Sequence, residues 1–326
     1  MTNGEGREEK EKKKKRDRIL NFVRIAVSLL GLAIIVLTQD LGQAFRLLLE
    51  MNWLPFLGTL ILFLSGSFIR SYRWGCLVWA LDVQVGYWRL VKLYFIGAFF
   101  SQFLPTGVGG DAVKMFELSR QDGKAANAIS SVLVDRFLGL FVLFALALVA
   151  LLFGRELVPE QARILIGVVF VTSLAGVALI LQRTWIASLG TRLGVDRVLG
   201  RVKILRELYE SLYLYGTAAL LKATAASLAW NLLLVFGYYL LGLAVGIDLP
   251  LWYYFLLVPV ISAAIMIPSL GGLGVREGAT VLLFTQVGVS EPQALALALA
   301  YLLALWFIAL LGGILYFVQG MRGTRD

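Results

Sequence analysis

The sequence predicts an all-α polytopic membrane protein with about six transmembrane helices and two re-entrant helical hairpins, arranged as an inverted-topology repeat. Of its 326 residues, 59% are hydrophobic and only 16% are charged, a composition too apolar for a water-soluble domain. Several apolar runs have the roughly twenty residues that a crossing of the hydrocarbon core requires. A phrase that opens with proline and contains two adjacent glycines occurs in each half of the chain, which indicates the repeat.

The predicted transmembrane helices are the apolar runs of sufficient length. They lie at 19–38, 53–70, 129–153, 163–182, 225–246 and 293–318. Residues 1–18 form a basic tail, which we expect to be disordered and cytoplasmic. We divide the remainder into a first membrane repeat, 19–160, and an inverted second repeat, 161–320. The second repeat includes a basic cytoplasmic or interfacial segment at 183–222.

Basic residues mark the cytoplasmic loops of membrane proteins and so predict the orientation. The N-terminal tail and the segments 70–92, 114–124 and 183–206 carry such residues, so we expect them, and both chain termini, on the cytoplasmic side of the cell membrane. The piece 93–105 lies between two cytoplasmic segments and is too short to cross the membrane and return, which predicts a re-entrant hairpin. By the same reasoning, 251–290 begins and ends outside and predicts a second hairpin that enters from the opposite face.

The second hairpin has an alternative. Residues 251–267 and 278–288 can also be read as two ordinary spans, which would give eight transmembrane helices. The second of these runs is short for a crossing, so we favour the hairpin. The segment 197–222 either lies along the inner interface or forms a solvated linker helix.

The composition excludes several kinds of chemistry. The chain has no histidine and a single cysteine, Cys76, so zinc sites, thiol catalysis and an intramolecular disulfide are not expected. No P-loop occurs, so any transport must draw on a gradient or a partner. The net charge of the chain is +9, and its basic residues lie beside the apolar spans. This position favours an anionic membrane surface over nucleic acid as the partner of the positive charge. We expect no cofactor and no metal.

The repeated phrase runs from 105 to 114 in its first copy and from 268 to 276 in its second. Aligned on the double glycine, both copies read Gly-Gly-x-small-Val-basic. Non-helical backbone at membrane depth is tolerated only where it is buried in protein or lines a wet cavity. Helical sequence follows each double glycine, and the free N–H groups at a helix start favour an anion. Lys114 and Arg276 add a positive charge in the first turn, which makes phosphate the expected ligand.

The candidate substrate-binding residues are those of the two phrases, together with an acid–base pair in the third span. They are Pro105, Gly107, Gly109, Gly110, Asp111, Lys114, Asp135, Arg136, Pro268, Gly271, Gly272, Gly274, Arg276 and Glu277.

The charged candidates leave several roles open. Asp111 is expected to be the N-cap of its helix rather than a catalyst. Asp135 and Arg136 open the third span and are costly there unless they are paired or face a cavity. Pairing with Lys114 or Glu277 is expected, either as a structural ion pair or as part of a substrate site. Glu277 is either a helix-dipole partner or a proton carrier. Polar residues that we interpret as structural are Ser101, Gln102 and Asn231.

These motifs resemble those of the lysylphosphatidylglycerol synthase transmembrane-region family of flippase-like integral membrane proteins. The first signature is similar to the phrase at 103–114, followed by Ser-Val-Leu-Val-Asp-Arg-Phe-Leu-Gly-Leu at 131–140, and the second to the phrase at 268–277. The resemblance covers nearly the whole chain from about residue 20, with Asp111 where the family often has glutamate.

The resemblance implies a lipid-handling role. Large members of the family aminoacylate phosphatidylglycerol and move the product between leaflets, and others accompany glycolipid or polyprenyl-linked sugar pathways. A soluble C-terminal domain carries the aminoacyl transfer in the large members, and this chain ends at Asp326 directly after its last span, so we expect the flippase part alone. The expected partners are an anionic membrane lipid, the membrane itself and enzymes of lipid or glycolipid synthesis.

Three functions fit the sequence, and we favour the first. It is a flippase that binds the phosphate headgroup of an anionic lipid, of phospholipid or polyprenyl-phosphate type, between the two hairpins. The second is a membrane enzyme that transfers a group to or from a lipid phosphate, for which Asp111, Asp135 and Glu277 would supply the acid–base groups. The absence of histidine, of an Asp-rich metal cluster and of a nucleophile elbow argues against it. The third is a small-solute or ion transporter of similar architecture.

Overall fold

The fold is described from a computed structural model of the chain, which covers 28–30, 33, 36–37, 40–103, 109–154, 160–181, 207, 210–212, 214–264, 269 and 272–323. All regular elements in these ranges are α-helices, so the predicted all-α class is confirmed. The tail at 1–18, most of the predicted span 19–38 and the basic stretch 183–206 lie outside the described residues.

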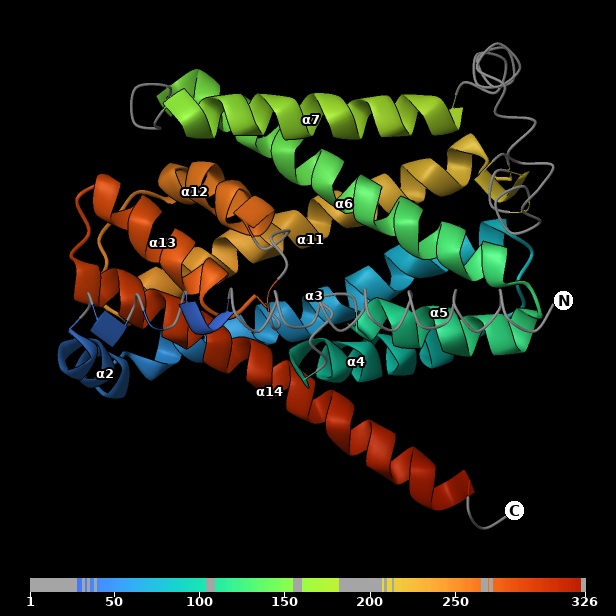
Figure 1. Cartoon of the computed structure of the whole chain (residues 1–326), viewed down its shortest axis with the longest axis horizontal. Coiled ribbons are helices and arrows are strands. Elements are labelled where there is room, and N and C mark those ends of the chain that lie inside the picture. Colours follow the sequence, from blue (N-terminus) through green and yellow to red (C-terminus); the bar gives the residue numbers. More distant parts are fainter. Residues whose placement is uncertain are drawn as a thin grey trace, which may run out of the picture.

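The helices follow one another along the chain and pack into one bundle (Figure 1). They are α2 (Leu41–Leu49), α3 (Trp53–Ala80), α4 (Tyr87–Phe103), α5 (Gly109–Asp122), α6 (Ala125–Gly154), α7 (Glu160–Leu181), α11 (Thr217–Ala244), α12 (Leu251–Ala264), α13 (Val275–Gln286) and α14 (Glu291–Gly323).

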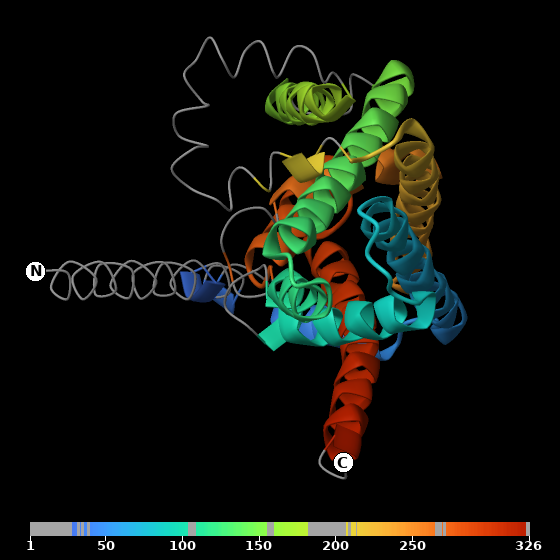
Figure 2. The ribbon, with the colours of Figure 1, turned by 90° about the vertical axis from the view of Figure 1, so that its right-hand side faces the viewer.

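Four helices in the described part of the chain, α3, α6, α11 and α14, are long and apolar enough to cross a membrane. They coincide with four of the predicted spans, and α7 coincides with one more, the predicted span at 163–182. The chain is therefore a polytopic membrane protein. Both views show the C-terminal part of α14 extending away from the other helices, where Ile314 and Phe317 are exposed (Figure 2).

The predicted end of the second span at residue 70 is wrong. Helix α3 continues to Ala80, so Arg70 and Arg73 lie within a membrane-spanning helix and not in a cytoplasmic loop. The side chain of Arg73 is only 5% exposed and forms an ion pair with Asp135 of α6. Because this carboxylate compensates its charge, the arginine is tolerated inside the helix, and a rule based on hydropathy ends the span too early.

Helices α3 and α11 pack against each other and run antiparallel. Asn52, just before α3, donates its backbone N–H to the carbonyl oxygen of Ala244 at the end of α11, at 2.8 Å. Near the other end of α3, Arg73 donates from Nη1 to Oγ of Ser227 in the first half of α11, at 2.9 Å. The two helices therefore contact each other along most of their length.

Helices α4 and α5 form one helical hairpin, and α12 and α13 form a second (Figure 1). The first hairpin begins and ends near the C-terminal end of α3, where Gln121 donates from its side chain to the carbonyl oxygen of Gln84 at 2.9 Å. The second begins and ends near the C-terminal end of α11, where Gln293 donates to the carbonyl oxygen of Gly246 at 3.0 Å. Since α3 and α11 are antiparallel, the hairpins open at opposite ends of the bundle.

The lengths of α12 and α13 bear on the number of spans. They have 14 and 12 residues. At about 1.5 Å per residue, neither reaches across a hydrocarbon core of about 30 Å. The helix lengths therefore favour a hairpin over the alternative of two further transmembrane helices.

Helix pairs that pack together in the first half of the chain have counterparts in the second. Helix α5 packs on α6 as α13 packs on α14, and α4 packs on α14 as α12 packs on α6. The contact between α4 and α14 is close, because a Cβ on Gly312 would collide with the backbone carbonyl of Phe95. Helices in corresponding positions of the two halves of the chain therefore make corresponding contacts.

Candidate functional site

The predicted site residues fall into two groups, one around α5 and α6 and one at the start of α13. Pro105, Gly107, Pro268 and Gly271 lie outside the described residues. The first group contains Gly109, Gly110, Asp111, Lys114, Asp135 and Arg136, and the second contains Gly272, Gly274, Arg276 and Glu277.

The first double glycine lets α5 begin against the backbone of α4. Gly109 and Gly110 are both buried in the first turn of α5. A Cβ on Gly110 would collide with the carbonyl oxygen of Gly97, and its N–H donates to Oγ of Ser101 at 3.1 Å. The second glycine is therefore required for close packing within the hairpin, and Ser101 has the structural role expected of it.

Asp111 links two cations, and its predicted role as an N-cap is wrong. Helix α5 already begins at Gly109, so Asp111 lies inside the first turn. One carboxylate oxygen contacts Nζ of Lys114 at 2.7 Å, and the other accepts a hydrogen bond from Nε of Arg136 on α6. The short side chain of Asp111 faces these two donors and not the start of the helix.

The charge of Asp111 is stabilised by these partners. Burial raises the pKa of the Asp111 carboxyl, but the charges of Lys114 and Arg136 and their hydrogen bonds lower it by more, so the pKa lies below its ordinary value. Asp111 is therefore an anion at neutral pH and neutralises part of the positive charge of its two neighbours.

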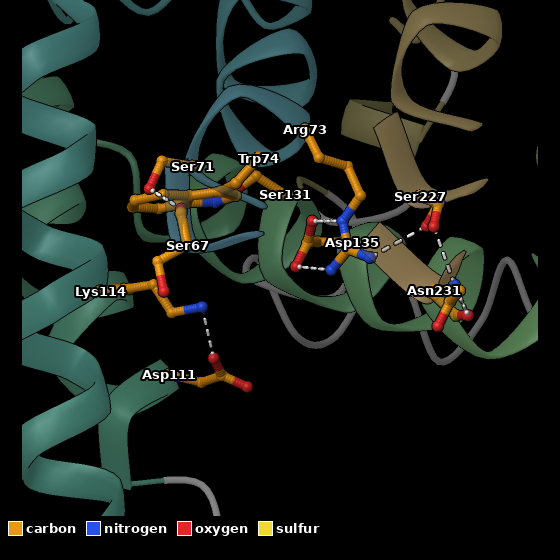
Figure 3. Close-up of polar contacts among 11 residues, drawn as sticks. Ser67, Ser71, Arg73, Trp74, Asp111, Lys114, Ser131, Asp135, Ser227 and Asn231 are labelled. Carbon is orange, nitrogen blue, oxygen red and sulfur yellow. Dashed lines mark hydrogen bonds and ion pairs between the residues drawn. The ribbon is translucent and has the colours of Figure 1, made fainter. Parts of the chain in front are cut away.

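The predicted partners of Asp135 and Arg136 were also wrong. Both residues lie well inside α6, which begins at Ala125. Arg136 donates a hydrogen bond to Asp111. The carboxylate of Asp135 accepts hydrogen bonds from Nε and Nη2 of Arg73, at 2.6 and 2.7 Å (Figure 3). The sequence placed Arg73 in a loop, so the true partner of Asp135 was not considered.

The Arg73–Asp135 pair joins three helices. Nη1 of Arg73 reaches Ser227 on α11, and Asn231 one turn later donates to the carbonyl oxygens of Ser227 at 2.9 Å and of Gly139 at 3.3 Å (Figure 3). All polar groups of this network are buried and bonded to one another, as a structural ion pair requires. The interpretation of Asn231 as a structural residue agrees with these contacts.

Lys114 is enclosed by aromatic rings as well as paired with Asp111. Its side chain is 8% exposed, and Nζ lies 4.8 Å from the ring centre of Tyr94 and 5.4 Å from that of Trp74. Trp74 is fixed in turn by a hydrogen bond from its indole N–H to Ser131 at 3.1 Å (Figure 3). The ammonium group is therefore largely removed from water.

The second motif uses glycines for a turn rather than for helix packing. Gly272 and Gly274 have φ angles of +83° and +79°, which only glycine adopts without strain, and α13 begins at Val275. Glu277 accepts the backbone N–H of Gly274 at 2.7 Å with one oxygen and the guanidinium of Arg276 at 2.6 Å with the other. Two roles were predicted for Glu277, and these contacts favour a helix-dipole partner at the start of α13 over a proton carrier.

The two motifs build comparable surroundings for their cations. The side chain of Arg276 is 2% exposed, and its Cζ lies 5.2 Å from the ring centre of Tyr301 on α14. Tyr301 stacks on Tyr238 of α11, with ring centres 4.4 Å apart. Arg276, like Lys114, thus has a carboxylate from its own motif and a tyrosine ring from another helix.

A further cation, Arg70 of α3, was missed as a site residue because the sequence placed it in a cytoplasmic loop. Its Cζ lies 4.9 Å from the ring centre of Tyr94 and 4.6 Å from that of Trp230. Phe63 contacts both Trp230 and Tyr301, with ring centres 6.0 and 5.6 Å apart. Arg70 thus connects Tyr94 to the contacting rings of Trp230, Phe63 and Tyr301, and we call these four rings, which lie between the two motifs, the central aromatic cluster.

Positive charge is in excess around this cluster. Among the described residues, three cations lie against rings of this cluster, and two of them, Lys114 and Arg276, each pair with a carboxylate of their own motif. The third, Arg70, has no carboxylate partner among the described residues, which leaves its positive charge uncompensated. The neighbouring sequence at 104–108 and 265–271 contains no charged residue. Within the described residues, no group of three or more His, Cys, Asp or Glu is placed to hold a metal ion.

Comparison with known proteins gives a family. The sequence profile of the lysylphosphatidylglycerol synthase TM region matches residues 21–313. A UPF0104 membrane protein from Pyrococcus horikoshii is 22% identical over 325 residues, a match that covers 90% of this chain and 96% of that protein. No solved structure gives a significant match.

Proposed function

Because the chain belongs to the family of the lysylphosphatidylglycerol synthase TM region, whose members are membrane proteins related to lipid handling, we propose that it is a flippase for an anionic lipid. The phosphate headgroup binds between the two hairpins, near Lys114 and Arg276, while the acyl or prenyl chains remain in the bilayer. One observation carries this proposal, the excess of positive charge around the central aromatic cluster.

An uncompensated cation inside a membrane protein is unfavourable unless an anion accompanies it. A lipid phosphate supplies such an anion, and its oxygens accept the strong charge-assisted hydrogen bonds that arginine and lysine donate. The alternative of an acid–base enzyme is less favoured, because Asp111, Asp135 and Glu277 each already contact a cation. A free carboxyl for proton transfer is not found among these three.

The transport step rests on an inverted repeat. We propose that the α4–α5 and α12–α13 hairpins are re-entrant from opposite faces of the membrane, so that each controls access to the site from one side. The opposite directions of the hairpins and the corresponding helix pairs support this proposal. Exposed basic residues at the open end of the first hairpin support a cytoplasmic position for that end. They are Arg89, Lys92, Arg120 and Lys124.

A reconstitution assay tests the function. Purified protein in vesicles of phosphatidylcholine and phosphatidylglycerol is expected to move fluorescent phosphatidylglycerol from one leaflet to the other, measured by chemical quenching of the outer leaflet. Labelled phosphatidylcholine in the same vesicles is the control and should move no faster than in protein-free vesicles. Equal movement of both lipids, or movement of neither, would contradict a phosphate-selective flippase.

A further inference from the structure

Arg70 differs from the other cations at the central aromatic cluster in having no carboxylate partner. Lys114 contacts Asp111 at 2.7 Å and Arg276 contacts Glu277 at 2.6 Å. Among the described residues no carboxylate pairs with Arg70, and its buried Nε has no hydrogen-bond partner. We propose that Arg70 forms the central anion subsite of the protein and donates hydrogen bonds to a phosphate group. This inference rests on the proposed function and names a residue that binds the phosphate of the headgroup.

The surroundings of Arg70 suit this role. A guanidinium is planar, so its faces pack against aromatic rings while its edge presents N–H donors to the two oxygens of a phosphate. The Cζ of Arg70 lies within 5 Å of the ring centres of both Tyr94 and Trp230, at 4.9 and 4.6 Å. The aromatic rings therefore hold the guanidinium in place without satisfying its hydrogen-bonding capacity.

The position of the ring beside Arg70 is set by α3 itself. Trp230 of α11 lies directly over Gly66, one turn before Arg70, where a Cβ would collide with the indole ring. Phe63, one turn earlier, contacts the same indole ring. Phe63, Gly66 and Arg70 therefore lie on one face of α3, and all three contact the indole ring of Trp230.

Arg70 is also placed to act together with the first motif. Tyr94 has Nζ of Lys114 at 4.8 Å from its ring centre and Cζ of Arg70 at 4.9 Å. Both cations thus lie within 5 Å of the centre of one ring, and Lys114 is already neutralised by Asp111, so Arg70 carries the free positive charge beside Tyr94. The ligand class is a phosphate monoester or diester, supplied by a lipid headgroup or by free phosphate.

Binding to the intact protein distinguishes these sources. The full chain is placed in nanodiscs of phosphatidylcholine, and the thermal midpoint of unfolding is measured with added inorganic phosphate or with phosphatidylglycerol in the disc. We compare Arg70→Gln and Arg70→Lys with Lys92→Gln, which removes an exposed charge from α4. Arg70→Gln should weaken anion binding at least about tenfold, judged from the shift of each variant's midpoint relative to its own midpoint in pure phosphatidylcholine. Arg70→Lys should be intermediate, because it keeps the charge but loses the planar fork.

The outcomes separate the subsite from the function. Stabilisation of wild type by phosphatidylglycerol alone identifies the lipid as the source, and stabilisation by inorganic phosphate as well shows that the phosphate group suffices; either result, with loss in Arg70→Gln but not in Lys92→Gln, supports the proposal. Wild-type affinity in Arg70→Gln would overturn the subsite and leave the flippase proposal standing. If wild type responds to neither anion, the proposed function itself fails, and the subsite with it.

Discussion

Removing the carboxylate of Asp135 should destabilise the protein far more than removing the whole ion pair. The Asp135→Leu variant leaves the Arg73 guanidinium, only 5% exposed, without its counterion and without two hydrogen bonds of 2.6 and 2.7 Å. Each bond to a charged group contributes about 1.5–3 kcal/mol, and breaking one side of a buried pair typically costs about 3–5 kcal/mol. The double variant Arg73→Met/Asp135→Leu removes both charges and should recover most of this loss.

The assay is equilibrium or thermal unfolding of the purified chain in one detergent, with wild type, both single variants and the double variant compared as a cycle. Binding of phosphatidylglycerol by the double variant should remain close to that of wild type, because the pair is structural. Two results would refute the reasoning: a single Asp135→Leu variant as stable as wild type, or a double variant no more stable than the single ones. A stable double variant that no longer binds lipid would instead assign Asp135 to the substrate site.

Three other predictions address packing, charge and topology. Gly110→Ala should lower the free energy of unfolding by about 1–3 kcal/mol, since a Cβ there collides with α4, whereas Gly167→Ala, with open space around it, should not; equal effects in unfolding assays would contradict the packing argument. Because folding lowers the pKa of Asp111, its contribution to stability is present above the unfolded pKa of about 3.9 and is lost as the pH falls through the folded value, so Asp111→Asn should flatten the acid limb of a stability–pH curve. In a cysteine-free background, single cysteines replacing Lys124 and Ser290 should react with impermeant thiol reagents from opposite sides of the membrane; labelling from one side would exclude hairpins of opposite direction.

Hydropathy predicted most of the membrane-spanning helices because their charge is low and their length is fixed by the bilayer. Helix α6 begins only four residues before its predicted start at 129, and α14 begins two residues before its predicted start at 293. Helices α3 and α11 are the exceptions. Helix α11 begins at Thr217, eight residues before its predicted start at 225, so the end of the predicted cytoplasmic or interfacial segment 183–222 belongs to this helix. The last turns of α3 contain Arg70 and Arg73, which a rule based on charge assigns to a loop. Their tolerance depends on partners from distant helices, and the sequence of α3 does not contain that information.

The motif predicted where the charged groups would gather but not how they would pair. Lys114 and Arg276 are both buried beside a carboxylate of their own motif, as their spacing allows. The pairs that cross between helices, such as Arg73 with Asp135, depend on packing that no local pattern specifies. Arg70 was overlooked for the same reason, since its neighbours Tyr94 and Trp230 become adjacent only in the folded bundle.

The central claim, that the protein holds a phosphate-bearing anionic lipid beside its central aromatic cluster, is tested most directly by native mass spectrometry of the chain released from a mixed-lipid membrane. The account predicts that wild type retains an anionic phospholipid in preference to phosphatidylcholine, and that this preference is lost in Arg70→Gln and kept in Lys92→Gln. Retention of neutral and anionic lipids in proportion to their abundance in the membrane would contradict it.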